Sequence, residues 1–277
     1  MKTYKEHYEK SREVSNIKSP TLPKYNSPYE VSIDTELLNL NDEYHRLVKI
    51  IAEKIKYKLD NEPSAIHEAR FTLYVNKWRD IPEIEELANL ILPQIEQNVF
   101  HSKLKVEFVL PYRNKITDLE PCASWVWHYD DCTPEFLKLA IYLNETTEDN
   151  GCFQYVRGSP LNNEYARTSP QVPVIPSYRD RPGPPLKQTF PGSRVPQHYV
   201  DGIISKGGKA DSLLGPRGTY ALFTPNIIHR ATKPLPSSTA REALFFFIRP
   251  SIKQGNFIDE DTNSILPNKD VKRYALD

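Results

Sequence analysis

The hydrophobic pattern of this 277-residue chain changes its period near residue 100. Before that point, apolar residues recur at steps of three and four over residues 35–59 and again from Ile81 onward, which is typical of amphipathic helices. After it come short runs of β-branched and aromatic residues bounded by turn signals, which are typical of strands. The runs are 105–110, 136–143, 152–156, 219–223 and 243–248.

The boundaries of the two helices can be predicted from local chemistry. We expect the first helix to be interrupted near Asn41 and the second to start at Pro82, with Asp80 as its N-cap. Strands that follow helices without regular alternation favour an antiparallel sheet or barrel braced by helices over a doubly wound parallel sheet. The predicted fold class is therefore mainly β with flanking helices.

The chain divides into a short arm and one domain. Residues 1–30 are polar, contain three prolines and lack apolar periodicity, so we expect an extended arm there. With 39% hydrophobic residues, the remainder has enough apolar material for a core. We expect residues 31–277 to form a single domain, with helical support at about 35–100 and the strands at about 105–250.

Charge and composition exclude several classes of function. The 36 Lys and Arg residues balance 36 Asp and Glu residues, so no global field favours nucleic acid or an anionic membrane surface. No apolar run is long enough to span a bilayer, and the first residues contain no apolar core of a secretion signal. Three cysteines without a CxxC pair predict reduced thiols. We expect a cytoplasmic protein, monomeric or homodimeric, with no nucleic-acid or membrane partner.

Residues 160–217 form an insertion rich in structure breakers. They hold 10 of the 24 prolines and 6 of the 10 glycines, which predicts a long loop. Eight Lys and Arg residues against four acidic ones leave a local basic surplus. The segment is either a solvated loop, which is the commoner case, or a lid that recruits an anionic substrate through Arg179, Arg181 and Arg194.

The segment from Ser124 to Asp131 contains a candidate metal site. In an extended backbone His128 and Asp130 point to the same side, so both can reach one metal ion. His229, at the end of a later strand, would complete a set of two imidazoles and one carboxylate, which is typical of non-haem Fe(II) oxygenases. The alternatives are a hydrogen-bonded His–Asp pair at the surface and a His229 satisfied within the core.

Arg241 leads into the apolar run 243–248 and would need an anionic partner there, because an unpaired buried charge is costly. A dicarboxylate cosubstrate could supply that partner. So could a protein carboxylate, such as Glu242 or Asp130.

The string WHYDDCTPEFLKLAIYLNETTEDNGCFQYVRGSP, which starts at Trp127, resembles the metal-binding half of the phytanoyl-CoA dioxygenase-like family of Fe(II)/2-oxoglutarate oxygenases. Its Asn-Gly and Gly-Ser turns match those of the family, and the distal histidine and the 2-oxoglutarate-binding arginine map onto His229 and Arg241. The similarity covers roughly residues 105–250. One departure is Ala231, where the family often has Ser or Thr.

The resemblance implies a double-stranded β-helix, which is a cupin-like jelly roll, with Fe(II), 2-oxoglutarate as cosubstrate and O2 as oxidant. It implies an enzyme that hydroxylates an unactivated C–H bond of a small molecule and releases succinate and CO2, with no catalytic residues beyond the metal ligands. Desaturation, epimerisation and cyclisation follow the same cofactor chemistry. The retained Asp130 disfavours halogenation.

Three further residues are candidates for contacts near the metal. Lys138 and Tyr142 share one face of their strand and either touch the cosubstrate or face solvent. Trp127 either forms an apolar wall near the iron and substrate or, more commonly for tryptophan, packs in the core. Two functions from other classes stay open: a jelly-roll binding module without catalysis, and a cupin-like metal hydrolase or isomerase, which would not need Arg241.

Overall fold

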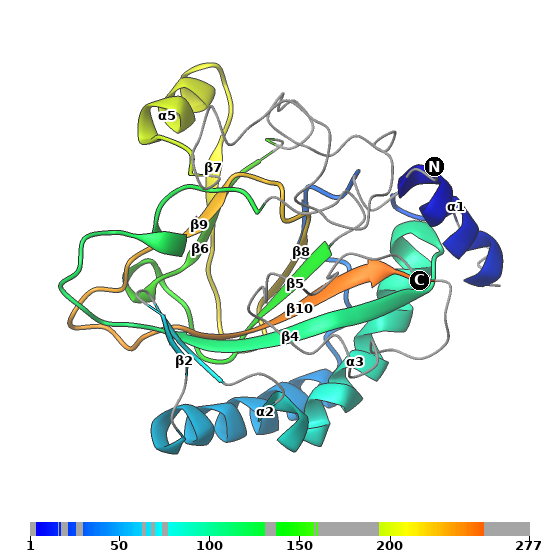
Figure 1. Ribbon diagram of the computed structural model, residues 1–277, viewed down its shortest axis with the longest axis horizontal. Helices are drawn as coiled ribbons and strands as arrows, with labels where there is room; N and C mark the ends of the chain where they lie inside the picture. Colours follow the sequence, from blue (N-terminus) through cyan, green and yellow to red (C-terminus); the bar gives the residue numbers. More distant parts are fainter. Residues whose placement is uncertain are drawn as a thin grey trace, which may run out of the picture.

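The computed structural model describes residues 4–15, 17, 22–25, 30–62, 65–67, 70–73, 77–130, 137–157, 159 and 194–251. In this part of the chain two antiparallel sheets are present (Figure 1). The large sheet has the order β1-β8-β5-β10-β4-β3-β2 and the small sheet the order β7-β6-β9. The predicted class, mainly β with flanking helices around a jelly-roll core, is confirmed.

The strands of the large sheet are β1 (Ile33–Asp34), β2 (Ala65–His67), β3 (Arg70–Thr72), β4 (Leu104–Asn114), β5 (Leu137–Tyr142), β8 (Tyr220–Phe223) and β10 (Glu242–Pro250). Those of the small sheet are β6 (Phe153–Val156), β7 (Ala210–Leu213) and β9 (His229–Ala231). The α-helices are α1 (Tyr4–Ser15), α2 (Asp42–Asn61), α3 (Pro82–Ile95) and α5 (Gln197–Ser205). Short turns of other helix types are Lys77–Asp80, Glu96–Phe100, Ala123–Trp125 and Glu148–Asn150.

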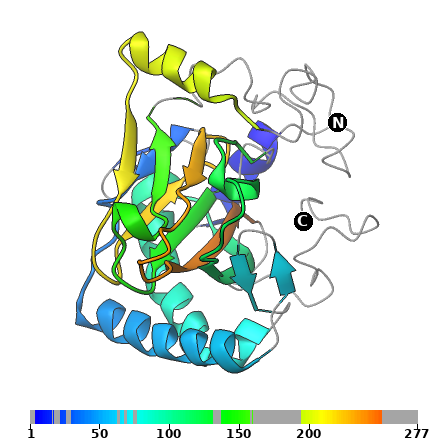
Figure 2. The same cartoon turned by 90° about the vertical axis from the view of Figure 1, so that its left-hand side faces the viewer.

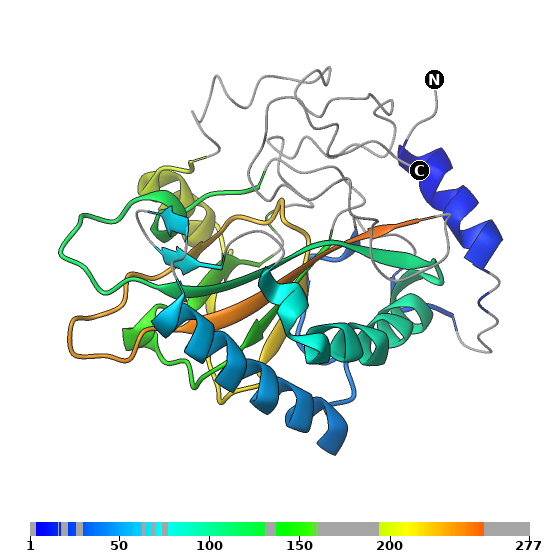
Figure 3. The ribbon, with the colours of Figure 1, turned by 60° about the horizontal axis from the view of Figure 1, so that its bottom comes forward.

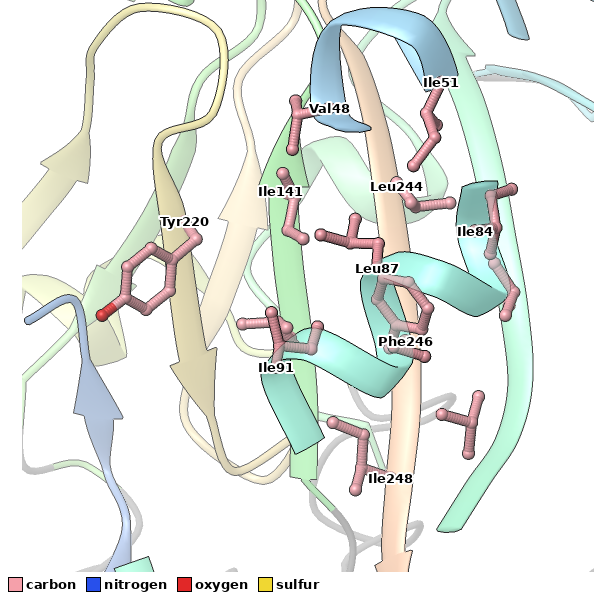
Figure 4. Packing of buried hydrophobic residues seen from close by; sticks show 14 of the residues in the cluster. Val48, Ile51, Ile84, Leu87, Ile91, Ile141, Tyr220, Leu244, Phe246 and Ile248 are labelled. Atoms are coloured by element: carbon pink, nitrogen blue, oxygen red, sulfur yellow. The ribbon is translucent and has the colours of Figure 1, made fainter. Parts of the chain in front are cut away.

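Helices α2 and α3 cover one face of the large sheet, which we call the outer face (Figure 1 and Figure 3). Alternate residues of β5 and β10 point toward the helices and form an aliphatic core with them (Figure 4). Helix α5 lies on the other side of the molecule, next to β7 (Figure 2). The opposite, inner face of the large sheet contributes to a second cluster together with residues of the small sheet.

The helix starts correct two predictions. Asn41 caps α2, its side chain accepting the Tyr44 N–H at 2.9 Å, so the predicted interruption is present but residues 35–40 are not helical. Helix α3 begins after Ile81 without any side-chain cap. The predicted cap, Asp80, ends a short 3-10 turn, and its carboxylate accepts a hydrogen bond from Lys58 Nζ at 3.0 Å instead.

Two predicted loops contain regular structure. Residues 4–15 of the expected extended arm form α1, whose Lys, Glu and Arg residues favour helix without an apolar stripe. Ser11 in this helix is buried and shares a hydrogen bond with Ser102. The last part of the expected insertion contains α5 and β7, so it belongs to the jelly roll. Among the described helices, none has the length and apolar character that crossing a membrane requires.

Candidate metal centre

His128 and His229 are brought together by the backbone. The two residues form an antiparallel bridge in which each N–H donates to the other's carbonyl, at 2.9 and 2.8 Å. Such a pair places both side chains on the same face of the sheet. Their ring centroids are 4.3 Å apart. Two histidines that lie far apart in the sequence thus become neighbours through strand pairing.

Asp130 joins them from two residues further along. Its N–H donates to the carbonyl of Pro225 at 2.8 Å, which fixes this strand-like segment against the chain that leads into β9. The carboxylate lies 4.0 Å from Nε2 of His128 and 3.4 Å from Nε2 of His229. Two ligands bound about 2.1 Å from one ion lie roughly 3 to 4.2 Å from each other. The three groups can therefore share one metal ion.

The histidine rings are oriented for metal binding. Nδ1 of His128 lies 2.9 Å from the carbonyl of Val126, and Nδ1 of His229 lies 2.7 Å from that of Ile227. A carbonyl only accepts, so each Nδ1 carries the proton, and Nε2 keeps its lone pair on the side that faces Asp130. Backbone carbonyls are common outer partners of metal-bound histidines.

The electrostatics of the cluster favour the metal-binding protonation states. Burial and the neighbouring His229 lower the pKa of His128 well below its ordinary value of 6.5, so this imidazole is neutral. Burial alone would raise the pKa of Asp130, but Lys138 and His229 outweigh it and hold the pKa well below 3.8. The cluster thus presents the neutral imidazole of His128 beside the ionised carboxylate of Asp130.

Arg241 is fully buried and has no carboxylate partner in the described chain. Its Nη2 donates to the hydroxyl of Tyr112, while Nε and Nη1 are buried without any hydrogen-bond partner. The two protein carboxylates considered as partners are engaged elsewhere: Glu242 with Arg113 at 2.5 Å, and Asp130 with Lys138. A guanidinium with two unused, desolvated donors is prepared for an anion.

Lys138 and Tyr142 lie on the inner face, as predicted, and both are buried, so neither faces solvent. Lys138 forms an ion pair with Asp130. The Tyr142 hydroxyl donates to the carbonyl of Leu213 at 2.8 Å and accepts the Phe153 N–H at 3.1 Å, which ties the two sheets together. Its ring lies 5.6 Å from the Arg241 guanidinium. Contact of either residue with a cosubstrate stays a prediction.

The four residues predicted to bind the substrate differ in where they lie. Trp127 packs with residues beneath α5 and donates to Gln197 at 3.0 Å, and its contact with a substrate stays a prediction. Arg194 is exposed, and its backbone forms a bridge with His128 at the edge of the site. Arg179 and Arg181 lie outside the described residues.

Two residues near Arg241 were missed by sequence reasoning. Tyr112 on β4 accepts the Arg241 hydrogen bond, and Arg70 on β3 lies with its guanidinium 5.5 Å from the centroid of the Tyr112 ring. The only available signal was the charge of Arg70 inside an otherwise strand-like run, which does not indicate its face or its partners.

Comparison with known proteins supports the fold. A scan against models of protein families and a search of curated proteins both found no match. Solved structures do match. A non-heme α-ketoglutarate-dependent epimerase, SnoN from nogalamycin biosynthesis, is 13% identical with a TM-score of 0.53, covering 81% of this chain and 80% of its own. The same epimerase in complex with Fe3+, α-ketoglutarate and nogalamycin RO has a TM-score of 0.52, with 81% of both chains covered.

A third similar structure is SnoK, a non-heme α-ketoglutarate-dependent carbocyclase from the same biosynthesis. It is 14% identical, with a TM-score of 0.50 and 86% of both chains covered. At these identities the likeness concerns the fold: the chain shares the jelly roll of 2-oxoglutarate-dependent non-haem enzymes. Membership of the phytanoyl-CoA dioxygenase-like family stays a prediction from the sequence motifs.

Proposed function

We propose that this protein is an Fe(II)- and 2-oxoglutarate-dependent oxygenase that hydroxylates an unactivated C–H bond of a small molecule and releases succinate and CO2. The single observation that carries the proposal is the combination of a His–Asp–His cluster with a buried, unpartnered arginine on the inner face of one jelly roll. The shared fold with α-ketoglutarate-dependent enzymes supports it.

The donor set fits Fe(II). Two imidazoles and one carboxylate occupying one face of an octahedron leave three positions open, which suits iron that must also take a cosubstrate and O2. Cys122 and Cys152, the free thiols described in the structure, are not in this cluster. His128, Asp130 and His229 would therefore hold the ion.

Arg241 fits the remote carboxylate of 2-oxoglutarate. A planar guanidinium binds a carboxylate through two parallel N–H donors, and in Arg241 such a pair can be formed by Nη1, which is unused, and the second N–H of Nη2. Tyr112 accepts the other N–H of Nη2 and so helps to hold the guanidinium in place. A metal hydrolase or isomerase on the same barrel would not need this arginine.

Other side chains around the cluster shield it from water and keep its carboxylate ionised. The rings of Phe153 and Phe223 lie 5.4 and 5.5 Å from the His229 ring and form an apolar wall beside it. Lys138 holds Asp130 in its ionised state through their ion pair. When bound, iron and 2-oxoglutarate supply the oxidising chemistry, and the protein positions the substrate carbon and excludes water.

Alternative outcomes with the same cofactors are desaturation, epimerisation and cyclisation, which depend on where the substrate is held. SnoN, with a similar fold, is an epimerase, and SnoK is a carbocyclase. The cofactor assignment is independent of that choice.

Anaerobic addition of Fe(II) and 2-oxoglutarate tests the proposal. We expect a visible charge-transfer absorption from the chelated cosubstrate, followed by slow succinate formation when air is admitted. Arg241→Lys should keep the metal and raise the KM for 2-oxoglutarate about ten-fold or more, since the fork is lost. A binding module would give no succinate, and a hydrolase would bind metal without this absorption.

A further inference from the structure

Arg70 lies on the inner face of the large sheet, at its β3 edge. In the pairing of β3 with β4, Arg70 stands opposite Asn114 and Thr72 opposite Tyr112. The guanidinium lies 5.5 Å from the Tyr112 ring centroid, and that of Arg241 lies 5.4 Å from the same centroid. Two arginines, one on β3 and one directly before β10, therefore flank one tyrosine.

Among the described residues, no acidic side chain forms an ion pair with Arg70, and its Nε is buried without a hydrogen-bond partner. Burial lowers the pKa of its guanidinium, which still remains protonated at neutral pH. Arg70 is only partly buried, but desolvation of its Nε without a partner still costs stability, which favours a binding role over a structural one.

The charges around the metal cluster are unbalanced. Asp130 is the acidic residue that interacts electrostatically with Arg70, and it is already paired with Lys138. Arg194 interacts with both Asp130 and Arg70. Among the described residues, three cationic side chains, Lys138, Arg70 and Arg194, thus share the Asp130 carboxylate. The two charges of Fe(II) would be cancelled by those of 2-oxoglutarate, so the cationic excess persists after both have bound.

We propose that Arg70 is a substrate-binding residue that takes an anionic group of the prime substrate, a carboxylate, sulfate or phosphate, with Arg194 at the edge of the same subsite. This inference rests on the proposed function, because the prime substrate is defined by it. Arg241 is assigned to the cosubstrate. Tyr112 lies between Arg241 and Arg70. The unused Nε supplies the donor that such a group would accept.

The probes for this subsite are inorganic sulfate and the pair benzoate and benzamide, which differ chiefly in charge. They are titrated into the full-length protein loaded anaerobically with Fe(II) and 2-oxoglutarate, with calorimetry and the charge-transfer band as readouts. We expect sulfate and benzoate to bind and benzamide not to bind. Arg70→Gln should weaken the binding of both anions about ten-fold or more, and leave 2-oxoglutarate affinity unchanged.

Arg46→Gln is the matched control, because Arg46 is exposed and paired with Glu43 at the surface. It should change none of these affinities. Equal anion binding by Arg70→Gln and wild type would overturn the inference. So would a fall in 2-oxoglutarate affinity with anion binding intact, since Arg70 would then belong to the cosubstrate site.

Stability separates this role from a structural one. Arg70→Gln removes an uncompensated charge, so the free protein should unfold at an unchanged or higher denaturant concentration. Arg70→Lys keeps the charge and should keep sulfate binding within a few-fold, which preserves the test if the Gln variant folds poorly. Loss of sulfate binding in a well-folded Lys variant, or a structural collapse of both variants, would contradict the inference. Failure of the proposed function is distinct: wild type would then lack the charge-transfer band and succinate formation.

Discussion

The two faces of the large sheet are built from the same strands but follow different rules. On the outer face, β10 presents Leu244, Phe246 and Ile248 to α2 and α3, where they join a large cluster of buried apolar side chains. On the inner face, Lys138 pairs with Asp130, whereas Arg70 and Arg241 have no carboxylate partner among the described residues. Apolar burial on the outer face stabilises the fold, and this stabilisation offsets the free-energy cost of the unpaired charges on the inner face.

Loss of a metal ligand is expected to have the largest functional effect. His229→Ala should lose bound Fe(II) and all succinate formation, because even outer partners of metal ligands cost about 10- to 100-fold in affinity when removed. Metal content after desalting and succinate by chromatography measure this. The urea midpoint of the metal-free variant should stay close to that of wild type. Retained metal and turnover would remove His229 from the site.

The outer face should carry the largest stability effect. Phe246 is fully buried against the helices, so Phe246→Ala should lower the free energy of unfolding by about 3–5 kcal/mol. Phe71→Ala on β3 is the matched control, since Phe71 is 37% exposed, and it should cost less than about 1 kcal/mol. Equal costs in urea unfolding would mean that the outer face does not dominate the core.

On the inner face, removal of a buried charged side chain should leave the free energy of unfolding unchanged or raise it. Arg241→Met removes a buried cation that has no carboxylate, so the metal-free protein should be unchanged or more stable by up to about 4 kcal/mol. The same variant should lose the charge-transfer band of 2-oxoglutarate. A destabilisation of more than about 1 kcal/mol in urea unfolding would show that Arg241 stabilises the fold and would weaken the comparison.

The smallest expected effect is a loss of stability as the pH falls. The folded pKa of His128 lies well below 6.5, so the unfolded chain takes up a proton first as pH falls, and stability drops between about 6.5 and the folded pKa. From pH 7.5 to 5.5 the loss from this residue should be about 1 kcal/mol. Urea midpoints of metal-free wild type and His128→Gln at both pH values isolate it. Parallel losses in the two proteins would contradict this assignment.

Much of this architecture is visible in the sequence because apolar periodicity reports which face is buried. The alternation over 136–144 placed Leu137, Leu139 and Ile141 in the core, and the structure confirms it. The same alternation left open whether Lys138 faces solvent. Its burial arises from the small sheet, which packs against the inner face, and no local pattern encodes that packing.

The site was predictable where its chemistry is local. His128 and Asp130 are two residues apart, and the strand-end position of His229 suggested the third ligand. Arg70 was not predictable because its role depends on the register of the β3–β4 pair, and Asp80 failed as a cap because Lys58 from another helix binds its carboxylate. These are contacts between distant segments.

Because His128 pairs with His229, the metal centre forms only when their two segments pair in the correct register. The two ligands lie about a hundred residues apart in the sequence, and they meet only through the backbone bonds that join their segments. A slip of one residue between these segments would turn one imidazole to the opposite side of the sheet and abolish the cluster. Metal uptake during refolding should consequently follow correct closure of the jelly roll, and an ion that binds only the closed form would select against misregistered chains.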